Sequence, residues 1–284
     1  MTRRDAMSEE VRSASKPTDE IKMDQYGEAA RAYIRARTGA TCAAFFLGYL
    51  KPGMTLLDCG CGEGTITVDL AALVAPGDVV GLDIAPGTLQ HARKLADERG
   101  LSNVRFEVGN VYALPFPDHS FDAVFSHALF EHLTDKPKAL GEIQRVLKPG
   151  GIFGVRAPDL GARILEPSDP LVDQFWQLFA KIREELGGEN NVGRRLCGLL
   201  RQTGFTEVSG SASFLSFGTP DRLHWFAELF GHFAVDSPYA AEWLARGWVE
   251  QETCERINAA WTAWAAQPDA FAAEAWCEAV GWKT

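Results

Sequence analysis

Short apolar runs alternate with segments of helical periodicity along the first half of the chain, and this alternation is the strongest constraint on the fold. The helical segments end in helix-terminating residues such as Gly100 and the Pro149-Gly150-Gly151 stretch. Strands that alternate with helices need right-handed crossovers, which predicts an α/β fold with a doubly wound, mostly parallel sheet and helices on both faces. The expected strands are residues 54–58, 79–83, 104–108, 121–126 and 152–155.

The composition changes after Pro158. All eight tryptophans lie beyond this residue, and the chain from about residue 220 reads as several aromatic-rich helices. Residues 192–203 are expected to form a helix, and residues 205–214 a returning strand. We therefore expect a disordered tail over residues 1–22, a Rossmann-like domain over 23–219 with a helical insertion at 160–190, and a Trp-rich helical cap over 220–284.

Charge and cysteine content narrow the expected partners. The chain has 28 Lys and Arg against 38 Asp and Glu, a formal net charge of −10, which argues against nucleic acid because such binding depends on clustered Lys and Arg. Apolar stretches are too short to span a bilayer, and no apolar signal core follows Arg3 and Arg4. The six cysteines lack the spacing of a metal site, so we expect reduced thiols in a cytoplasmic protein that acts on a small molecule. The tryptophans also suit a subunit contact in a homodimer.

The most specific motif follows the first expected strand. Asp58 ends the strand, and Gly60, Gly62 and Gly64 follow at alternate positions before a helix begins. Glycines there let a ligand approach the main chain, and the helix N-terminus suits an anionic group of that ligand. Asp83 ends the next strand, where a carboxylate can accept both hydroxyls of a ribose. The pattern therefore predicts a nucleoside site.

The glycine spacing separates two classes of nucleoside. A dinucleotide site uses Gly-x-Gly-x-x-Gly, whereas here the third glycine comes one residue earlier. Asp58 would repel a pyrophosphate but would attract an ammonium and a sulfonium. The motif therefore favours a cationic amino-acid nucleoside over NAD, and a nicotinamide oxidoreductase is the weaker alternative.

Four stretches together give a family resemblance. They are the loop from Asp58 to Gly64, Asp83 within residues 81–85, residues 109–116 followed by Ser120-Phe121-Asp122, and residues 145–151. With these stretches, residues from about 37 to 214 resemble a class I S-adenosylmethionine-dependent methyltransferase of the ubiquinone/menaquinone-biosynthesis-like type. The resemblance implies a seven-stranded sheet whose last strand is antiparallel, which suits residues 205–214 and a short later strand near 215–218.

The resemblance also implies roles for individual residues in binding S-adenosylmethionine. Gly60 and its neighbours, Asp58, Cys61 and Gly62, would hold the methionine part, and Asp83 the ribose hydroxyls. Ile84 would cover one face of the adenine, Asn110 would meet the adenine amino group, and the Val111 backbone would meet a ring nitrogen. Asp is usual in the family at the position of Asn110, but an amide oxygen can accept the same hydrogen bond. Arg37, before the first strand, could reach the cofactor carboxylate or lie on a solvated helix face.

Three further residues are candidates for handling the methyl acceptor. The resemblance implies that His127, after the fourth strand, lies near the sulfonium, and it is our candidate general base because imidazole titrates near neutrality. A packed or cofactor-contacting histidine is the alternative. Arg156 and Asp159 could bind polar substrate groups or form an internal salt bridge. We expect methyl transfer to oxygen, carbon or nitrogen of a small, hydrophobic or aromatic metabolite; the alternative is a fold that binds the cofactor but promotes a cyclisation or rearrangement.

Overall fold

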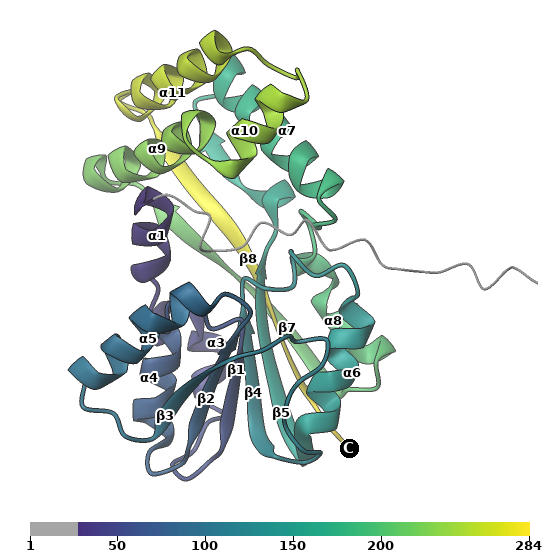
Figure 1. The fold of residues 1–284 in the computed structure, drawn as a ribbon. Coiled ribbons are helices and arrows are strands. Elements are labelled where there is room, and N and C mark those ends of the chain that lie inside the picture. Colours follow the sequence, from purple (N-terminus) through teal and green to yellow (C-terminus); the bar gives the residue numbers. More distant parts are fainter. Residues whose placement is uncertain (1–27) are drawn as a thin grey trace, which may run out of the picture.

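The computed structural model describes residues 28–284 (Figure 1). The tail expected over residues 1–22 lies outside the described residues. The described chain begins with three short helices, α1 (Glu28–Arg35), α2 (Gly39–Cys42) and α3 (Ala44–Leu47). The side chain of Thr38 caps α2 by accepting from the backbone of Thr41.

Five parallel strands form the body of the sheet, in the order β3-β2-β1-β4-β5. This order confirms the doubly wound, mostly parallel arrangement, because the strand order reverses between β1 and β4. The strands are β1 (Leu56–Cys59), β2 (Val79–Asp83), β3 (Val104–Val108), β4 (Phe121–His127) and β5 (Leu147–Pro158). The helices that connect or flank them are α4 (Thr65–Val74), α5 (Pro86–Glu98), α6 (Lys136–Val146) and α8 (Leu196–Gln202), which follows the 3₁₀ turn Gly193–Arg195.

Side-chain alternation along the central strands explains why helices cover both faces of the sheet. Leu57 and Val80 belong to one buried cluster together with residues of α6 and α8. Their neighbours Leu56 and Val79 belong to another cluster with residues of α3 and α4. Successive residues of a strand point to opposite faces, so an apolar run buries both faces only when helices pack on each.

The C-terminal segment corrects the expected strand count and the expected all-helical cap. Residues Phe271–Trp282 form β8, so the sheet has eight strands rather than seven. β8 is the antiparallel strand: it pairs with β5 on one edge and with β7 (Thr206–Phe217) on the other. The short strand expected near 215–218 is the end of β7. The Ala-rich β8 sequence favours a helix by local propensity, but pairing along both edges overrides that preference.

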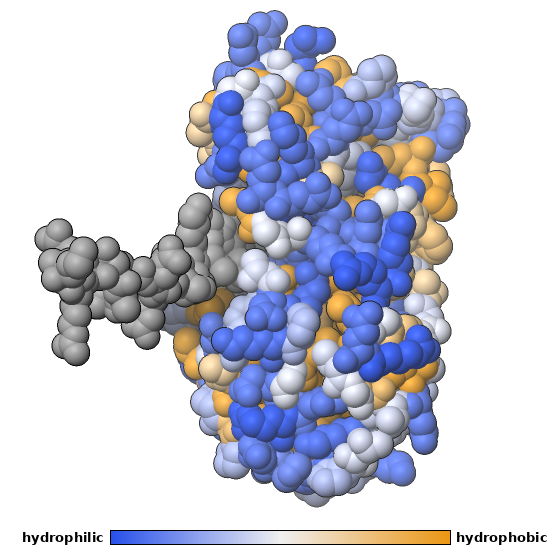
Figure 2. All heavy atoms as spheres, turned by 90° about the vertical axis from the view of Figure 1, so that its right-hand side faces the viewer, coloured by the Kyte–Doolittle hydropathy of each residue, from blue (hydrophilic) through white to orange (hydrophobic). Residues whose placement is uncertain are grey.

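The Trp-rich segment forms a cap above the carboxyl ends of the parallel strands (Figure 1). Its aromatic core includes Phe175, Trp176, Trp243, Trp261 and Trp264, all buried. The cap elements are the 3₁₀ turn Leu160–Ala162, β6 (Ile164–Glu166), α7 (Pro170–Glu185), α9 (Pro220–Val235), α10 (Pro238–Ala245) and α11 (Gln251–Ala265). The face shown in Figure 2 is largely hydrophilic, with hydrophobic residues in scattered groups.

β8 joins the cap to the sheet. Residues 271–273 of β8 pair with β6 in the cap, and residues 276–282 pair with β5 in the body. Helix α1 contacts α9, so the N-terminal part of the described chain also reaches the cap. The strand ends that carry the expected site residues therefore face the underside of the cap. Within residues 28–284, none of the helices combines the length and apolar character that crossing a bilayer requires.

Candidate active site

The glycine loop adopts a backbone shape that requires glycine. Gly60 and Gly62 lie at the tip of β1 with φ values of +75° and +53°, a region that side chains disfavour. A Cβ built on Gly60 would lie 3.2 Å from the side chain of Leu129. The Gly60 amide donates to the Leu82 carbonyl at 2.8 Å. The loop thus closes across the tips of β1 and β2 and presents bare main chain beside them.

Asp83 connects the glycine loop to the tip of β2. Its Oδ2 accepts from the Gly62 amide and its Oδ1 accepts from the Ala85 amide, both at 2.9 Å. These two backbone donors fix the orientation of the carboxylate. The geometry fits a carboxylate that receives ribose hydroxyls beside the loop.

Asp58 is a buried carboxyl group beside a second one. It is 2% exposed and accepts from the Thr67 hydroxyl at 2.6 Å. Burial raises the pKa of Asp58 to about 7; the Thr67 hydrogen bond opposes this and the charge of Asp83 adds to it. A cation placed at these strand tips would favour the ionised form of Asp58. The two carboxyl groups, of Asp58 and Asp83, therefore fit the positively charged ammonium and sulfonium of the expected S-adenosylmethionine.

Two further residues of the loop, Cys61 and Glu63, are suited to roles other than binding a ligand through their charge. Burial raises the pKa of the Cys61 thiol, so the thiol stays protonated. Glu63 was missed by the sequence analysis: it is buried and accepts from the Arg35 guanidinium at 2.5 Å. This ion pair ties α1 to the glycine loop. The sequence shows a Glu at the start of a helix, but gives no sign of its distant partner.

The expected adenine contacts lie at the tips of β2 and β3. Ile84 is 45% exposed, which is unusual for an isoleucine beside a buried strand and suits a flat ring laid against it. The Asn110 Oδ1 accepts from the Tyr112 amide at 2.9 Å, so this amide oxygen also shapes its own turn. The Val111 side chain packs in the core below the loop.

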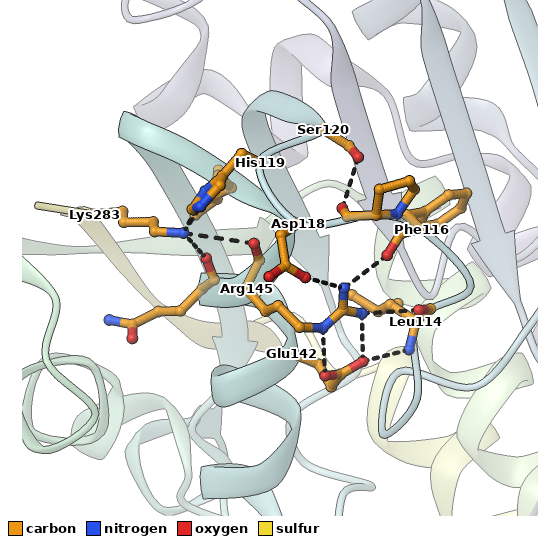
Figure 3. A network of polar contacts seen from close by, with 11 residues as sticks. Leu114, Phe116, Asp118, His119, Ser120, Glu142, Arg145 and Lys283 are labelled. Atoms are coloured by element: carbon orange, nitrogen blue, oxygen red, sulfur yellow. Dashed lines mark hydrogen bonds and ion pairs between the residues drawn. The ribbon is translucent and has the colours of Figure 1, made fainter.

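Arg145 fastens the loop that follows Asn110 and Val111 to α6 (Figure 3). Its guanidinium donates to the carbonyls of Leu114 and Phe116 at 2.9 and 2.7 Å. It also pairs with Glu142 on its own helix at 2.8 Å, and Glu142 accepts from the Leu114 amide at 2.7 Å. One arginine thus satisfies several main-chain groups of the loop, which holds the loop after Asn110 and Val111 in place.

His127 is the last residue of β4. The residue is 6% exposed, and its ring stacks on Trp276 of β8, with 4.8 Å between the ring centroids. Neither ring nitrogen has a hydrogen-bond partner within residues 28–284. Burial, with the charges of Arg37 and Arg156, holds the pKa of His127 well below its usual 6.5. The imidazole is therefore neutral at physiological pH.

Arg156 and Asp159 do not form the salt bridge with each other that was one reading of the sequence. The Arg156 guanidinium lies over the Trp276 ring at 4.5 Å and donates to Glu278 at 3.3 Å. Asp159 accepts two hydrogen bonds from Arg194, from Nε and Nη2, each at 2.6 Å. Each residue therefore has its own partner, and only Arg156 lies beside His127.

Two cavities lie between the cap and the strand ends. The larger, here called the His127 cavity, has a volume of about 370 Å³ and is lined by His127, Arg156, Trp225 and Trp276 among others. The smaller, here called the cap chamber, has a volume of about 140 Å³. Tyr33, Arg37 and Trp276 line both cavities. Arg37 is thus placed between the two, over the ring of Trp276 at 5.7 Å.

The cap chamber has an aromatic wall and a polar end. Apart from Arg37, which follows α1, its polar residues were not singled out from the sequence, because they come from α1, α7, β8 and the loop after β4, which only the fold brings together. A single local signal existed, the Glu131-His132 pair just after β4. The apolar lining includes Trp176, Phe179, Phe230, Phe233 and Tyr239, and the polar lining includes Tyr33, Arg37, Glu131, His132, Arg183 and Glu274.

Comparisons with known proteins agree with this site. Residues 50–196 match the family model described as "Methyltransferase domain". An uncharacterised methyltransferase of Schizosaccharomyces pombe is 35% identical over 230 residues, which are 76% of this chain and 81% of that protein. The ubiquinone/menaquinone biosynthesis C-methyltransferase UbiE of Hahella chejuensis is 37% identical over 133 residues, 46% of this chain and 51% of that protein.

The same fold occurs in a solved structure that holds the demethylated cofactor. A phosphoethanolamine N-methyltransferase of Haemonchus contortus, in complex with phosphomonomethylethanolamine and S-adenosylhomocysteine, aligns with a TM-score of 0.53 at 22% identity. The alignment covers 84% of this chain and 50% of that one. The chain belongs to the class I S-adenosylmethionine-dependent methyltransferases, and its cofactor is S-adenosylmethionine.

Proposed function

We propose that this methyltransferase acts on a small aromatic or apolar metabolite bound between the cap and the strand ends. The observation that carries the proposal is the cap chamber, an aromatic-walled cavity that shares Trp276 with the cavity beside His127. Aromatic side chains favour flat apolar ligands, and a cavity of about 140 Å³ matches one known to hold a benzene ring.

Residues at the strand tips would hold the methyl donor on the sheet side. Asp83 would accept the ribose hydroxyls, and Asp58 with the Gly60, Cys61 and Gly62 main chain would hold the methionine part. Ile84, Asn110 and Val111 would surround the adenine. Arg37, which lines both cavities, is within the site as the proposed partner of the cofactor carboxylate. The cofactor supplies an electrophilic methyl group; the chain supplies orientation and a dry pocket, because the sulfonium charge disperses during transfer.

His127 is proposed to accept a hydrogen bond from the nucleophilic atom of the acceptor. Its neutral ring has two unpartnered nitrogens and is oriented by stacking on Trp276. The lowered pKa makes it a weak base, so it suits an acceptor whose proton is already acidic or absent. Arg156, beside it, would bind a polar group of the acceptor. The Asp159 carboxylate already accepts hydrogen bonds from Arg194, so we propose that it affects substrate binding indirectly, by holding its own loop in place.

The wider setting follows from composition. The acidic net charge favours a small-molecule partner over nucleic acid. All six cysteines, which lie within the described chain, are free thiols, and this favours a reducing compartment such as the cytoplasm. The homodimer stays a prediction, which sedimentation of the full chain would test.

The test is a screen of aromatic and apolar acceptors with the full chain and S-adenosylmethionine. Release of S-adenosylhomocysteine in step with methylated product is the expected result, and Asp83→Ala should abolish both. A product formed without S-adenosylhomocysteine would instead support the alternative, a cofactor-binding fold that promotes a cyclisation or rearrangement. The weak basicity of His127 favours this alternative, because such a reaction needs no strong base. Transfer only to nucleic acid or protein would contradict the proposal.

A further inference from the structure

Arg183 of α7 is a buried cation without a hydrogen-bond partner for its Nε and Nη2 atoms in the part of the chain that the structure describes. The residue is 7% exposed and lines the polar end of the cap chamber. Its guanidinium lies over the ring of Phe179, 5.5 Å from the ring centroid. A buried guanidinium that leaves N–H groups unsatisfied carries a large desolvation cost, which a ligand with matching acceptors would offset.

The two unsatisfied atoms define the shape of that ligand. Nε and Nη2 form the edge with which arginine holds a carboxylate through two parallel hydrogen bonds. The same chain shows this arrangement elsewhere: Arg194 holds Asp159 through its own Nε and Nη2, each at 2.6 Å. In Arg183 both atoms of that edge are buried, the residue lines the chamber, and no carboxylate within residues 28–284 forms an ion pair with it.

The other charged groups of the chamber also favour an anion. Arg37 and Arg183 bring two guanidinium groups to the chamber. Burial raises the pKa of Glu131 and of Glu274, and Glu274 accepts a hydrogen bond from Tyr33 at 2.5 Å. Burial lowers the pKa of His132 to about 3, so this ring is neutral. Burial works against the two negative charges of the chamber, whereas Arg37 and Arg183 each bring a guanidinium group to it, so its polar end suits an anion.

We infer that the methyl acceptor is an aromatic carboxylic acid whose carboxylate is held by the Nε and Nη2 edge of Arg183 while its ring lies against the aromatic wall of the cap chamber. This inference rests on the proposed function and specifies its substrate class. Arg183 is a specificity-determining residue in this account. Glu131, which is 3% exposed and whose Oε2 has no hydrogen-bond partner within residues 28–284, is the carboxyl group of the same chamber that would repel this ligand when ionised.

The experiment measures binding of benzoate and benzamide to the full chain saturated with S-adenosylhomocysteine, by NMR titration. The two probes share a ring and differ in charge. We expect benzoate to bind more tightly, and Arg183→Gln to weaken benzoate binding on the order of 10- to 100-fold while changing benzamide binding little. Glu131→Gln should strengthen benzoate binding, because it removes a like charge. Arg246→Gln, at an arginine of the cap that pairs with Glu185 and Glu242 outside the chamber, is the matched control.

Arg183→Met separates a binding role from a structural one. Replacing an unpartnered buried charge with an apolar side chain should raise the midpoint of thermal unfolding while abolishing the preference for benzoate. A lowered midpoint, an unchanged benzoate-to-benzamide ratio in Arg183→Gln, or weaker benzoate binding in Glu131→Gln would each overturn the inference. Release of S-adenosylhomocysteine is measured separately and distinguishes the two proposals. Transfer to neutral aromatic acceptors with no preference for a carboxylate would contradict this inference alone. Selective benzoate binding without transfer to any aromatic acceptor would contradict the proposed function.

Discussion

The buried carboxyl group of Asp58 makes a quantitative prediction about stability and cofactor binding. Its pKa is about 7 in the folded chain against 3.8 for an ordinary aspartate. A raised carboxyl pKa means that the folded state retains a proton which the unfolded state has released. Stability from this group is therefore present at low pH and is lost as the pH rises toward 7. The interval of about three pH units corresponds to about 4 kcal/mol.

Asp58→Asn removes this titration and keeps an oxygen that can accept from Thr67. We expect the variant to be more stable than the wild type at pH 8 and the difference to shrink toward pH 5. The change in the difference between those two pH values should be on the order of 3 kcal/mol. The assay is urea unfolding of both proteins at several pH values. A difference that does not vary with pH would refute the reasoning.

Cofactor binding should reverse the advantage of the variant. A cationic donor beside Asp58 favours the ionised form, so wild-type affinity for S-adenosylmethionine should rise as the pH increases through about 7. Calorimetry at pH 6.5 in buffers of different ionisation enthalpy should register proton release on binding. Asp58→Asn should bind more weakly and release less of a proton. Equal affinity and equal proton release in the two proteins would contradict a direct role for this carboxylate.

Two further predictions concern the loop after Val111 and the His127 side chain. Arg145→Ala should lower the free energy of unfolding by about 1 to 3 kcal/mol and weaken S-adenosylmethionine binding, because it leaves the carbonyls of Leu114 and Phe116 without their donor. An unchanged midpoint of urea unfolding would contradict this expectation. Arg105→Ala, on the exposed edge of β3, is the control. His127→Ala should lower kcat with little change in S-adenosylmethionine affinity. In the wild type, the pH–rate profile should show no inflection near 6.5 from this residue, because the pKa of His127 lies well below that value; an inflection there that disappears in His127→Ala would argue against it.

The strand-end residues could be predicted because their signals are local. Asp58 and Asp83 each end a short apolar run, and the glycines between β1 and α4 need positive φ at fixed positions. Parallel strands bring such ends to one edge of the sheet, so chain order alone places these residues together. Their neighbours in sequence carry enough information to define that half of the site.

The cap chamber could not be predicted to the same degree, because its residues come from elements that lie far apart in the sequence. Trp276 and Glu274 lie on β8, whose Ala-rich sequence favours a helix until both of its edges are paired. Arg183 lies on a cap helix and Tyr33 on α1. Nothing in their local sequence states that these helices and that strand meet, so the chamber emerges only from tertiary packing.

Asp58 and Asp83, at the tips of the adjacent strands β1 and β2, are proposed to bind the positively charged S-adenosylmethionine. Calorimetric titration of the full chain with S-adenosylmethionine tests this proposal most directly, beside Asp83→Ala and a control at exposed Asp97 of α5. We expect saturable binding by the wild type and by Asp97→Ala, and affinity reduced by at least about tenfold in Asp83→Ala, since hydrogen bonds to a charged group are lost. Undiminished affinity in Asp83→Ala would contradict the account.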